Sequence, residues 1–164
     1  MTDLPPLTAD RITTAVARLF LERGAACIRE FTVRTGRRAD LMILGDGREI
    51  TIIEVKSSRQ DFISDQKWPE YTEWADRFYF AVAADFPHEI LPGPDRCGII
   101  ITDGFDCHII QEAPEAKLAG ARRTHLVARL AHKAMRRLER AVQAGAEALT
   151  TDDDTPDETP DRTG

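Results

Sequence analysis

The stretch that decides the fold reads Arg38-Ala-Asp-Leu-Met-Ile-Leu44, then Gly45-Asp-Gly-Arg48, then Glu49-Ile-Thr-Ile-Ile-Glu-Val-Lys56. Two short apolar runs flank a glycine-containing turn, a pattern typical of a β-hairpin because glycine accepts the positive φ that tight turns need. Apolar residues on both strand faces predict a sheet that is covered on both sides. Three charged residues stand inside these strands nonetheless: Asp40, Glu54 and Lys56. Charges that break a consistent apolar pattern mark a candidate functional site.

The register of this hairpin decides whether the charged residues meet. Side chains two apart on a strand share a face, so Glu54 and Lys56 project together. A three-residue loop, Asp46 to Arg48 with Gly47 left-handed, would place Asp40 directly opposite Glu54. A two-residue loop would send the two carboxylates to opposite faces. We predict the first register.

The rest of the chain predicts an α/β fold with a mixed sheet. Before the hairpin we expect a helix that is capped by Thr8 and ends at Gly24, and then a half-exposed strand near a sheet edge. The strand over 78–83 should be parallel to the hairpin strand before it, because a helical crossover connects them. The remaining predicted elements are a short helical turn, a break and a second helix within 57–74, a single-turn or irregular segment over 87–94, a second hairpin over 98–110, and a long C-terminal helix from about Glu115.

Composition predicts one domain with an acidic tail. We expect a loose N-terminus over residues 1–7, a single domain over 8–149, and a disordered acidic tail over 150–164. The tail holds six acids against one base, so it accounts for −5 of the net charge of −6. The body is therefore almost neutral, and the acidic total does not exclude a nucleic-acid partner.

Three cysteines without close spacing, Cys27, Cys97 and Cys107, are typical of reduced thiols. No apolar run approaches the roughly 18 residues that a membrane span needs. We therefore expect a cytoplasmic protein with no membrane partner.

The three hairpin charges have a specific chemical interpretation. Two facing carboxylates, Asp40 and Glu54, would bind a hard divalent cation such as Mg²⁺ or Mn²⁺. Lys56 would then orient or deprotonate a water that attacks phosphorus. The competing interpretation is a structural ion pair in which Lys56 neutralises Glu54. The charge pattern alone favours neither.

Asp40 followed by Glu54-Val55-Lys56 resembles the PD-(D/E)XK nuclease core, and the predicted α-β-β-β-α-β order over about Thr8 to Ala84 resembles it too. The resemblance implies a restriction-endonuclease-like fold and assigns Asp40, Glu54 and the Val55 carbonyl to a metal. It also implies that Gln66 or Lys67 approaches the active site, with Gln66 as a catalytic candidate.

The chain departs from the nuclease pattern at two places. Ala39 stands where a proline usually precedes the aspartate, and the middle of the first helix reads Ala15-Val-Ala-Arg18, with no supporting acid. The second departure favours a weakened or inactive nuclease.

A longer string is similar to the MmcB-like bacterial DNA-repair proteins. It includes Glu54-Val-Lys-Ser-Ser58, Asp61-Phe62, Asp65-Gln-Lys-Trp-Pro69, Tyr71 and Phe78-Tyr-Phe-Ala-Val82, and the similarity continues to about Leu138. This resemblance implies a role in DNA repair.

Basic residues near the hairpin are the candidates for DNA binding: Arg34, Arg37, Arg38, Arg59 and Lys67. A second set, Arg129, Lys133, Arg136, Arg137 and Arg140, forms a stripe on the predicted C-terminal helix. This stripe would either follow a DNA backbone or be a solvated helix face. The acidic tail would either compete with DNA for a basic patch or serve solubility.

The sequence therefore predicts a DNA-repair protein that acts on DNA as a Mg²⁺-dependent phosphodiesterase, a nuclease of the hydrolase class. The alternatives are an inactive nuclease-like module that binds DNA or a repair partner, and a scaffold whose basic helix docks another protein. Exposed edge strands would allow a homodimer, although no residue requires one.

Overall fold

The computed structural model describes residues 7–152 of the chain, with side chains for residues 7–145. The chain divides into a sheet unit, residues 1–125, and a helical unit, residues 126–164. The elements in order are α1 (Ala9–Glu22), β1 (Ala26–Thr32), β2 (Arg38–Leu44), β3 (Ile50–Lys56), α2 (Arg59–Ser64), η1 (Trp68–Trp74), β4 (Arg77–Ala83), η2 (His88–Ile90), β5 (Gly98–Thr102), β6 (Cys107–Gln111) and α3 (Gly120–Asp152).

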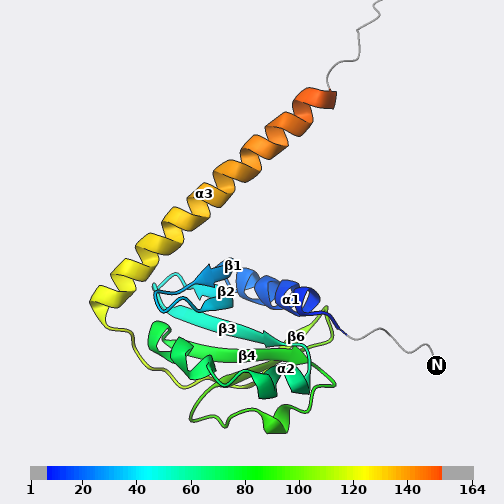
Figure 1. Cartoon of the computed structure of the whole chain (residues 1–164), viewed down its shortest axis with the longest axis vertical. Coiled ribbons are helices and arrows are strands. Elements are labelled where there is room, and N and C mark those ends of the chain that lie inside the picture. Colours follow the sequence, from blue (N-terminus) through cyan, green and yellow to red (C-terminus); the bar gives the residue numbers. More distant parts are fainter. Residues whose placement is uncertain (1–6, 153–164) are drawn as a thin grey trace, which may run out of the picture. The chain divides into compact units, whose positions relative to one another are not determined.

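The six strands form one mixed sheet whose spatial order, β1-β2-β3-β4-β5-β6, is the order of the chain (Figure 1). Strands β1, β2 and β3 are antiparallel, β3, β4 and β5 are parallel, and β6 returns antiparallel to β5. The predicted α/β class with a mixed sheet is therefore confirmed. So are the edge position of β1, the parallel β3–β4 pair and the second hairpin.

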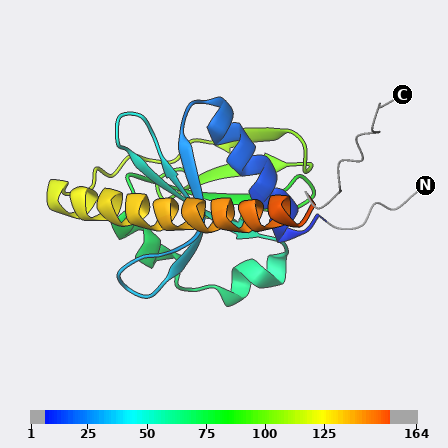
Figure 2. The ribbon, with the colours of Figure 1, turned by 90° about the horizontal axis from the view of Figure 1, so that it is seen from above.

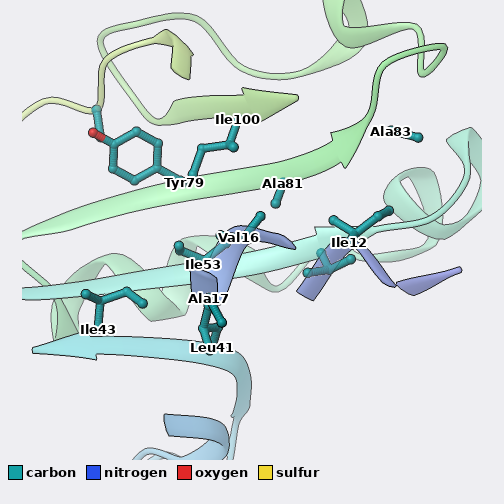
Figure 3. Packing of buried hydrophobic residues seen from close by; sticks show 12 residues of the cluster. Ile12, Val16, Ala17, Leu41, Ile43, Ile53, Tyr79, Ala81, Ala83 and Ile100 are labelled. Atoms are coloured by element: carbon teal, nitrogen blue, oxygen red, sulfur yellow. The ribbon is translucent and has the colours of Figure 1, made fainter. Parts of the chain in front are cut away.

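Helix α1 covers one face of the sheet. Thr8 caps it by accepting the Arg11 N–H at 3.3 Å, as predicted. Ile12 and Val16 on α1 are fully buried, and they belong to one apolar cluster with the side chains of β2, β3, β4 and β5 that point to this face (Figure 3). The cluster members contributed by the strands are Leu41, Ile43, Ile53, Val55, Tyr79, Ala81, Ala83 and Ile100.

Aromatic side chains from α2 and η1 cover the other face. The Trp68 ring lies 5.5 Å from the Phe78 ring in a stacked arrangement and 5.4 Å from the Phe80 ring in an edge-to-face one. Tyr71 also stacks on Phe78, and Phe62 meets Phe80 edge-on. These side chains pack into the core, and both faces of the central strands are buried, as predicted.

The turn between β2 and β3 has the predicted three-residue loop with a different left-handed residue. The Gly45 N–H donates to the Glu49 carbonyl at 3.0 Å, and the Arg48 N–H donates to the Gly45 carbonyl at 3.1 Å. Arg48, with φ 66°, takes the left-handed conformation. The prediction that Gly47 does so was wrong, because in a turn followed by a bulge the third loop residue takes the positive φ.

The short α2, the break after it and the second helical segment η1 appear in the predicted order, with Pro69 near the start of η1. Two details differ from expectation. The segment η1 is a 3₁₀-helix. Helix α3 begins at Gly120 rather than near Glu115 and continues as one helix to Asp152 (Figure 2). It thus includes the first three residues of the tail predicted to be disordered. The remainder of that tail and the predicted loose residues 1–6 lie outside the described residues.

Asp76, just before β4, connects the hairpin to the start of α3. Its buried carboxylate accepts the Ile50 N–H at 2.7 Å and the Leu118 N–H at 2.9 Å. Arg123 donates to both carboxylate oxygens, at 2.6 and 2.7 Å, and also to the Arg48 carbonyl at 2.7 Å. The Arg123 guanidinium therefore binds both Asp76 and Arg48, the left-handed residue of the hairpin turn.

Within the described residues, no helix is both long enough and apolar enough to cross a membrane. All three cysteines are free.

We predict that Asp76→Asn lowers the free energy of unfolding by about 2–4 kcal/mol at neutral pH, because half-buried Arg123 then faces a neutral amide instead of a carboxylate. Burial alone would raise the pKa of Asp76, but the bonds from Arg123, Ile50 and Leu118 lower it to about 2. The stabilisation is therefore fully present above the unfolded pKa of about 3.9 and is lost as pH falls towards 2. Urea unfolding across this pH range measures the effect.

Asp46→Asn on the exposed hairpin turn is the matched control and should change stability by less than about 0.5 kcal/mol. Equal stability of Asp76→Asn and the parent at neutral pH would contradict the assigned role of Asp76.

Candidate active site

The candidate site lies where the β2–β3 ladder ends. Leu41 opposite Ile53 is the last paired position, and one step further in the same register Asp40 stands opposite Glu54. Beyond the last backbone pair, side-chain carboxylates accept the hydrogen bonds between the two strands. The Asp40 N–H donates to Glu54 Oε1 at 3.3 Å, and the Val55 N–H donates to Asp40 Oδ2 at 2.8 Å. The predicted register is confirmed, and each carboxylate is held by a backbone N–H.

Lys56 shares this face of the sheet with both carboxylates. Its Nζ lies 3.9 Å from Glu54 Oε2 and 2.7 Å from Asp65 Oδ2. Asp65 follows α2, and its other oxygen accepts the Lys67 N–H at 3.0 Å. The predicted Lys56–Glu54 proximity is present, but Asp65 is the closer partner of the lysine. The site therefore contains three carboxylates and one ammonium group.

The two facing carboxylates are electrostatically unfavourable when both are ionised. Burial first, and then the negative charge of Asp40, raise the pKa of Glu54 to about 8. Burial also raises the pKa of Asp40, although the Val55 N–H and Lys56 oppose this shift. The raised pKa values indicate that the positive charge of Lys56 does not fully neutralise the two carboxylates.

In the Lys56–Asp65 pair, by contrast, both pKa shifts favour the charged forms. Burial lowers the pKa of Lys56, but the hydrogen bond and charge of Asp65, with Glu54, outweigh burial and raise it. Burial raises the pKa of Asp65, but the bonds from Lys56 and the Lys67 N–H outweigh burial and lower it. Both groups are charged at neutral pH, so Lys56 is an ammonium group.

The donor set suits a hard divalent cation. Carboxylate oxygens are the ligands that Mg²⁺ and Mn²⁺ prefer, and Asp40 Oδ1 accepts no hydrogen bond from the described part of the chain. Over the described residues there is no cluster of three or more His, Cys, Asp or Glu side chains with the geometry of a metal site. Two carboxylates are nevertheless enough for Mg²⁺, which usually keeps several waters.

Tyr71 lies against the site from η1. Its buried hydroxyl donates to the Arg38 carbonyl at 2.9 Å, which fixes the first residue of β2. Burial, followed by the charges of Glu54, Asp40 and Asp65, raises the pKa of Tyr71, so the phenol stays protonated. Tyr71 thus positions the strand that carries Asp40.

The predicted DNA-binding arginines beside the site differ in their surroundings. Arg37 donates to both oxygens of Glu70, at 2.9 and 3.2 Å. Arg38 is exposed, and its guanidinium lies 3.9 Å from the Glu30 carboxylate. Arg34 is exposed on the loop between β1 and β2. Arg38 is close enough to lower the pKa of Asp40, which places its charge near the carboxylates.

The predicted residues after β3 are exposed. Arg59 begins α2, and Lys67 directly precedes η1. Gln66 lies beyond the end of α2, and its side-chain amide donates to the Ile63 carbonyl at 2.8 Å. The structure brings Asp40, Glu54 and Lys56 together, whereas the Gln66 amide bonds within its own turn.

Sequence reasoning did not predict the bond between Asp65 and Lys56 or the bond between Tyr71 and the start of β2. An aspartate just after a short helix resembles an ordinary polar loop residue, and an aromatic residue in the pattern Trp68, Tyr71, Trp74 indicates core packing. The spacing of Asp65 from Lys56 could have suggested the pair only if the length of α2 were known.

Two of three comparisons place the chain among known proteins. Residues 5–145 match the family described as "DNA repair protein MmcB-like". A solved structure, that of a protein of unknown function from Silicibacter pomeroyi, is 40% identical with a TM-score of 0.75. The similarity covers 96% of this chain and 99% of that one. None of the curated proteins compared matches the chain.

We predict that Glu54→Gln is more stable than the parent without metal, because it removes one of two repelling buried carboxylates. The pKa of Glu54 is raised from about 4.3 in the unfolded chain to about 8, so the parent loses stability as pH rises through this window. The gain should therefore grow with pH, to on the order of 1–3 kcal/mol near pH 9. Urea unfolding in EDTA at about pH 5, 7 and 9 measures it.

Glu22→Gln, an exposed glutamate on α1, should leave stability within about 0.5 kcal/mol at each pH. If Glu54→Gln were less stable than the parent across the whole range, the carboxylate pair would be a stabilising network rather than a strained one.

Proposed function

Because the chain belongs to the MmcB-like family of DNA repair proteins, we propose that it acts on DNA as a metal-dependent phosphodiesterase with a restriction-endonuclease-like core. One observation carries the proposal: Asp40 and Glu54 face each other on a buried hairpin, with Lys56 on the same face. The order α1-β1-β2-β3-α2-β4 supports the proposed core, since it is the order that the nuclease resemblance implies.

Asp40 and Glu54 would hold Mg²⁺ or Mn²⁺. The Val55 N–H points towards β2, and in a β-strand the carbonyl of the same residue points to the same side. That geometry supports the Val55 carbonyl as a third oxygen ligand, since the β2–β3 ladder has already ended at Leu41 and Ile53. A bound divalent cation would offset the negative charge that builds on the phosphate.

Lys56 would orient the attacking water rather than deprotonate it. The raised pKa of Lys56 keeps the side chain an ammonium group, which can donate hydrogen bonds but cannot accept a proton. Asp65 holds Nζ by a bond of 2.7 Å and thereby fixes where its remaining N–H groups point. The proton of the water would therefore leave to solvent or to a phosphate oxygen.

The exposed basic residues around the site would hold the DNA backbone by their charge. Arg34, Arg38, Arg59 and Lys67 are accessible for this role, whereas Arg37 would first exchange Glu70 for phosphate. Gln66 would reach the site only if its amide left the Ile63 carbonyl. It stays a catalytic candidate on the nuclease resemblance alone.

A second function is an inactive module that binds DNA or a repair partner. The observation that favours it is the composition of α1, where buried Ala15, Val16 and Ala17 occupy the middle of the helix and its two acids, Asp10 and Glu22, lie near the ends. Binding by such a module would survive both EDTA and Glu54→Ala.

We predict that Asp40→Asn, Glu54→Gln and Lys56→Met each lower Mg²⁺-dependent or Mn²⁺-dependent DNA cleavage by about a hundredfold or more, since each removes a ligand or the water-orienting group. The assay uses single strands, nicked duplexes, flaps and junctions. Glu22→Gln is the control and should cleave like the parent. Salt-sensitive binding without cleavage by the parent, on every substrate and with either metal, would instead support the inactive module.

We predict that Asp65→Asn lowers the cleavage rate about tenfold to a hundredfold with little change in DNA affinity, because Lys56 keeps its charge but loses its orientation. Asp85→Asn, at an exposed position after β4, is the matched control. The acidic limb of the pH–rate profile should also change in Asp65→Asn. An unchanged rate would show that Asp65 serves only local structure.

A further inference from the structure

Helix α3 has an exposed face that carries only small and apolar residues. At 100° per residue, this face covers an arc of about 140° over residues 128–145, and no charged or polar residue of that stretch falls within the arc. Its members, which we call the α3 seam, are Ala128, Ala131, Ala134, Met135, Leu138, Ala141, Val142 and Gly145. All of them are exposed, and they lie on one continuous helix (Figure 2).

Three large apolar side chains dominate the seam. Met135 is 70% exposed, Leu138 is 66% exposed and Val142 is 56% exposed. Single apolar residues scattered over a surface are normal, but these three lie on the same side of one helix with only alanine and glycine beside them. A contiguous exposed apolar patch of this kind marks a site of protein association.

The spacing within the seam selects a helix as its partner. Six of its members follow one another at alternating intervals of three and four residues: Ala128, Ala131, Met135, Leu138, Val142 and Gly145. This is the spacing of the a and d positions of a heptad, with Met135 and Val142 at a and Leu138 at d. Side chains in this pattern insert between those of a facing helix that has the same repeat.

We propose that α3 pairs through the seam with α3 of a second copy of this chain, as an antiparallel two-helix coiled coil. Of the other α-helices in the described part of the chain, α1 already buries its apolar face and α2 has only six residues. The matching surface is therefore the seam itself, which a two-fold axis brings together with its own copy. The pairing goes beyond the proposed function and does not depend on it.

The sizes of the seam residues favour the antiparallel direction. With the two-fold axis between positions 136 and 137, Met135 faces Leu138 of the partner subunit, and Val142 faces Ala131 of the partner subunit. The largest side chains then meet in the centre, and the next layer opposes a larger residue to a small one. A parallel pair in register would oppose Gly145 to Gly145 and Ala131 to Ala131, which leaves those layers poorly filled.

The residues that border the seam agree with this direction. His132 and Glu139 lie along one border, and both are exposed. In the antiparallel register His132 approaches Glu139 of the partner subunit, and the same contact occurs twice by symmetry. Along the other border Ala134 approaches Ala141 of the partner subunit. These small side chains allow the two helices to approach closely, and no like charges meet across the seam.

The length of the seam predicts a weak dimer. Residues 128–145 span about 26 Å at 1.5 Å per residue, which is about two and a half heptads. Sustained coiled coils take at least roughly three to four heptads, so this interface is at the small end of specific interfaces. We expect a dissociation constant on the order of 10–100 µM, and therefore a dimer that forms and dissociates with protein concentration.

Sedimentation equilibrium of the full chain, without DNA or metal, tests the pairing. Over the concentration range of the expected dissociation constant, the molar mass should rise from 18.4 kDa towards twice that value. Leu138→Glu should raise the dissociation constant about tenfold or more, because it buries a carboxylate in the centre of the seam. Ala144→Glu is the matched control, since it adds the same charge at an exposed position on a separate side of α3. It should dimerise like the parent.

Circular dichroism checks that both variants keep the helix content of the parent. A parent that stays monomeric over this concentration range would overturn the pairing. So would a Leu138→Glu variant that dimerises like the parent, because the interface would then lie elsewhere on the molecule. Since no DNA is present, either failure leaves the proposed function standing, and a lack of DNA cleavage would leave the pairing standing.

Disulfide formation tests the direction of the pair. When Ala131→Cys and Val142→Cys chains are mixed and gently oxidised, the mixed disulfide should exceed both homodisulfides, since only the antiparallel register brings these two positions together. In that register the two copies of position 131 lie about 16 Å apart along the helix axis, too far for a disulfide. Intact mass spectrometry distinguishes the three products. Predominant homodisulfides would overturn the antiparallel direction.

Two controls measure the background of this oxidation. Ala144→Cys, at an exposed position away from the seam, reports disulfides that form by random collision. The parent reports its native thiols, which should react slowly because burial raises the pKa of both Cys27 and Cys97 to about 11 and also raises that of Cys107. A mixed disulfide no more abundant than the Ala144→Cys product would overturn the proposed register.

Discussion

The β2–β3 hairpin pairs in the register that sets Leu41 opposite Ile53, and this register places Asp40 opposite Glu54. A shift of the pairing by one residue would send the Glu54 side chain to the other face of the sheet, away from Asp40, so the contact between the two carboxylates depends on this register. Helix α1 packs on one face and the aromatic residues of η1 on the other. The core therefore stabilises an arrangement that would be unfavourable for the charged residues alone.

Two buried acidic centres in the sheet unit illustrate opposite electrostatic designs. Asp76 is surrounded by donors from Arg123 and two backbone N–H groups, and its pKa falls to about 2. Glu54 faces another carboxylate, and its pKa rises to about 8. The first centre is satisfied within the protein and stabilises the fold. At the second centre the two carboxylates are not neutralised by the protein, which is expected at a functional site where a bound cation would supply the missing positive charge.

Local sequence patterns predicted those features that depend on neighbouring residues. The Thr8 cap, the edge strand, the hairpin register and the facing carboxylates follow from alternation and turn chemistry. The left-handed residue of the turn was missed, because a glycine at the centre of the loop is a stronger signal than the bulge position that Arg48 occupies. The partners of Lys56 and Asp76 were also missed, since Asp65 and Arg123 approach them only after α2 and the start of α3 have packed.

The spatial order of the strands has a further consequence for how the chain reaches this structure. Every strand pairs with the strand next to it in the chain, so each new strand joins the sheet at one growing edge. A protein synthesised from its N-terminus can therefore form α1, β1, β2 and β3 before the later strands emerge from the ribosome. Pairings between sequence neighbours also lower contact order, which favours rapid folding. The carboxylate pair would then form early, and the contact between Arg123 and Asp76 would close the sheet unit last.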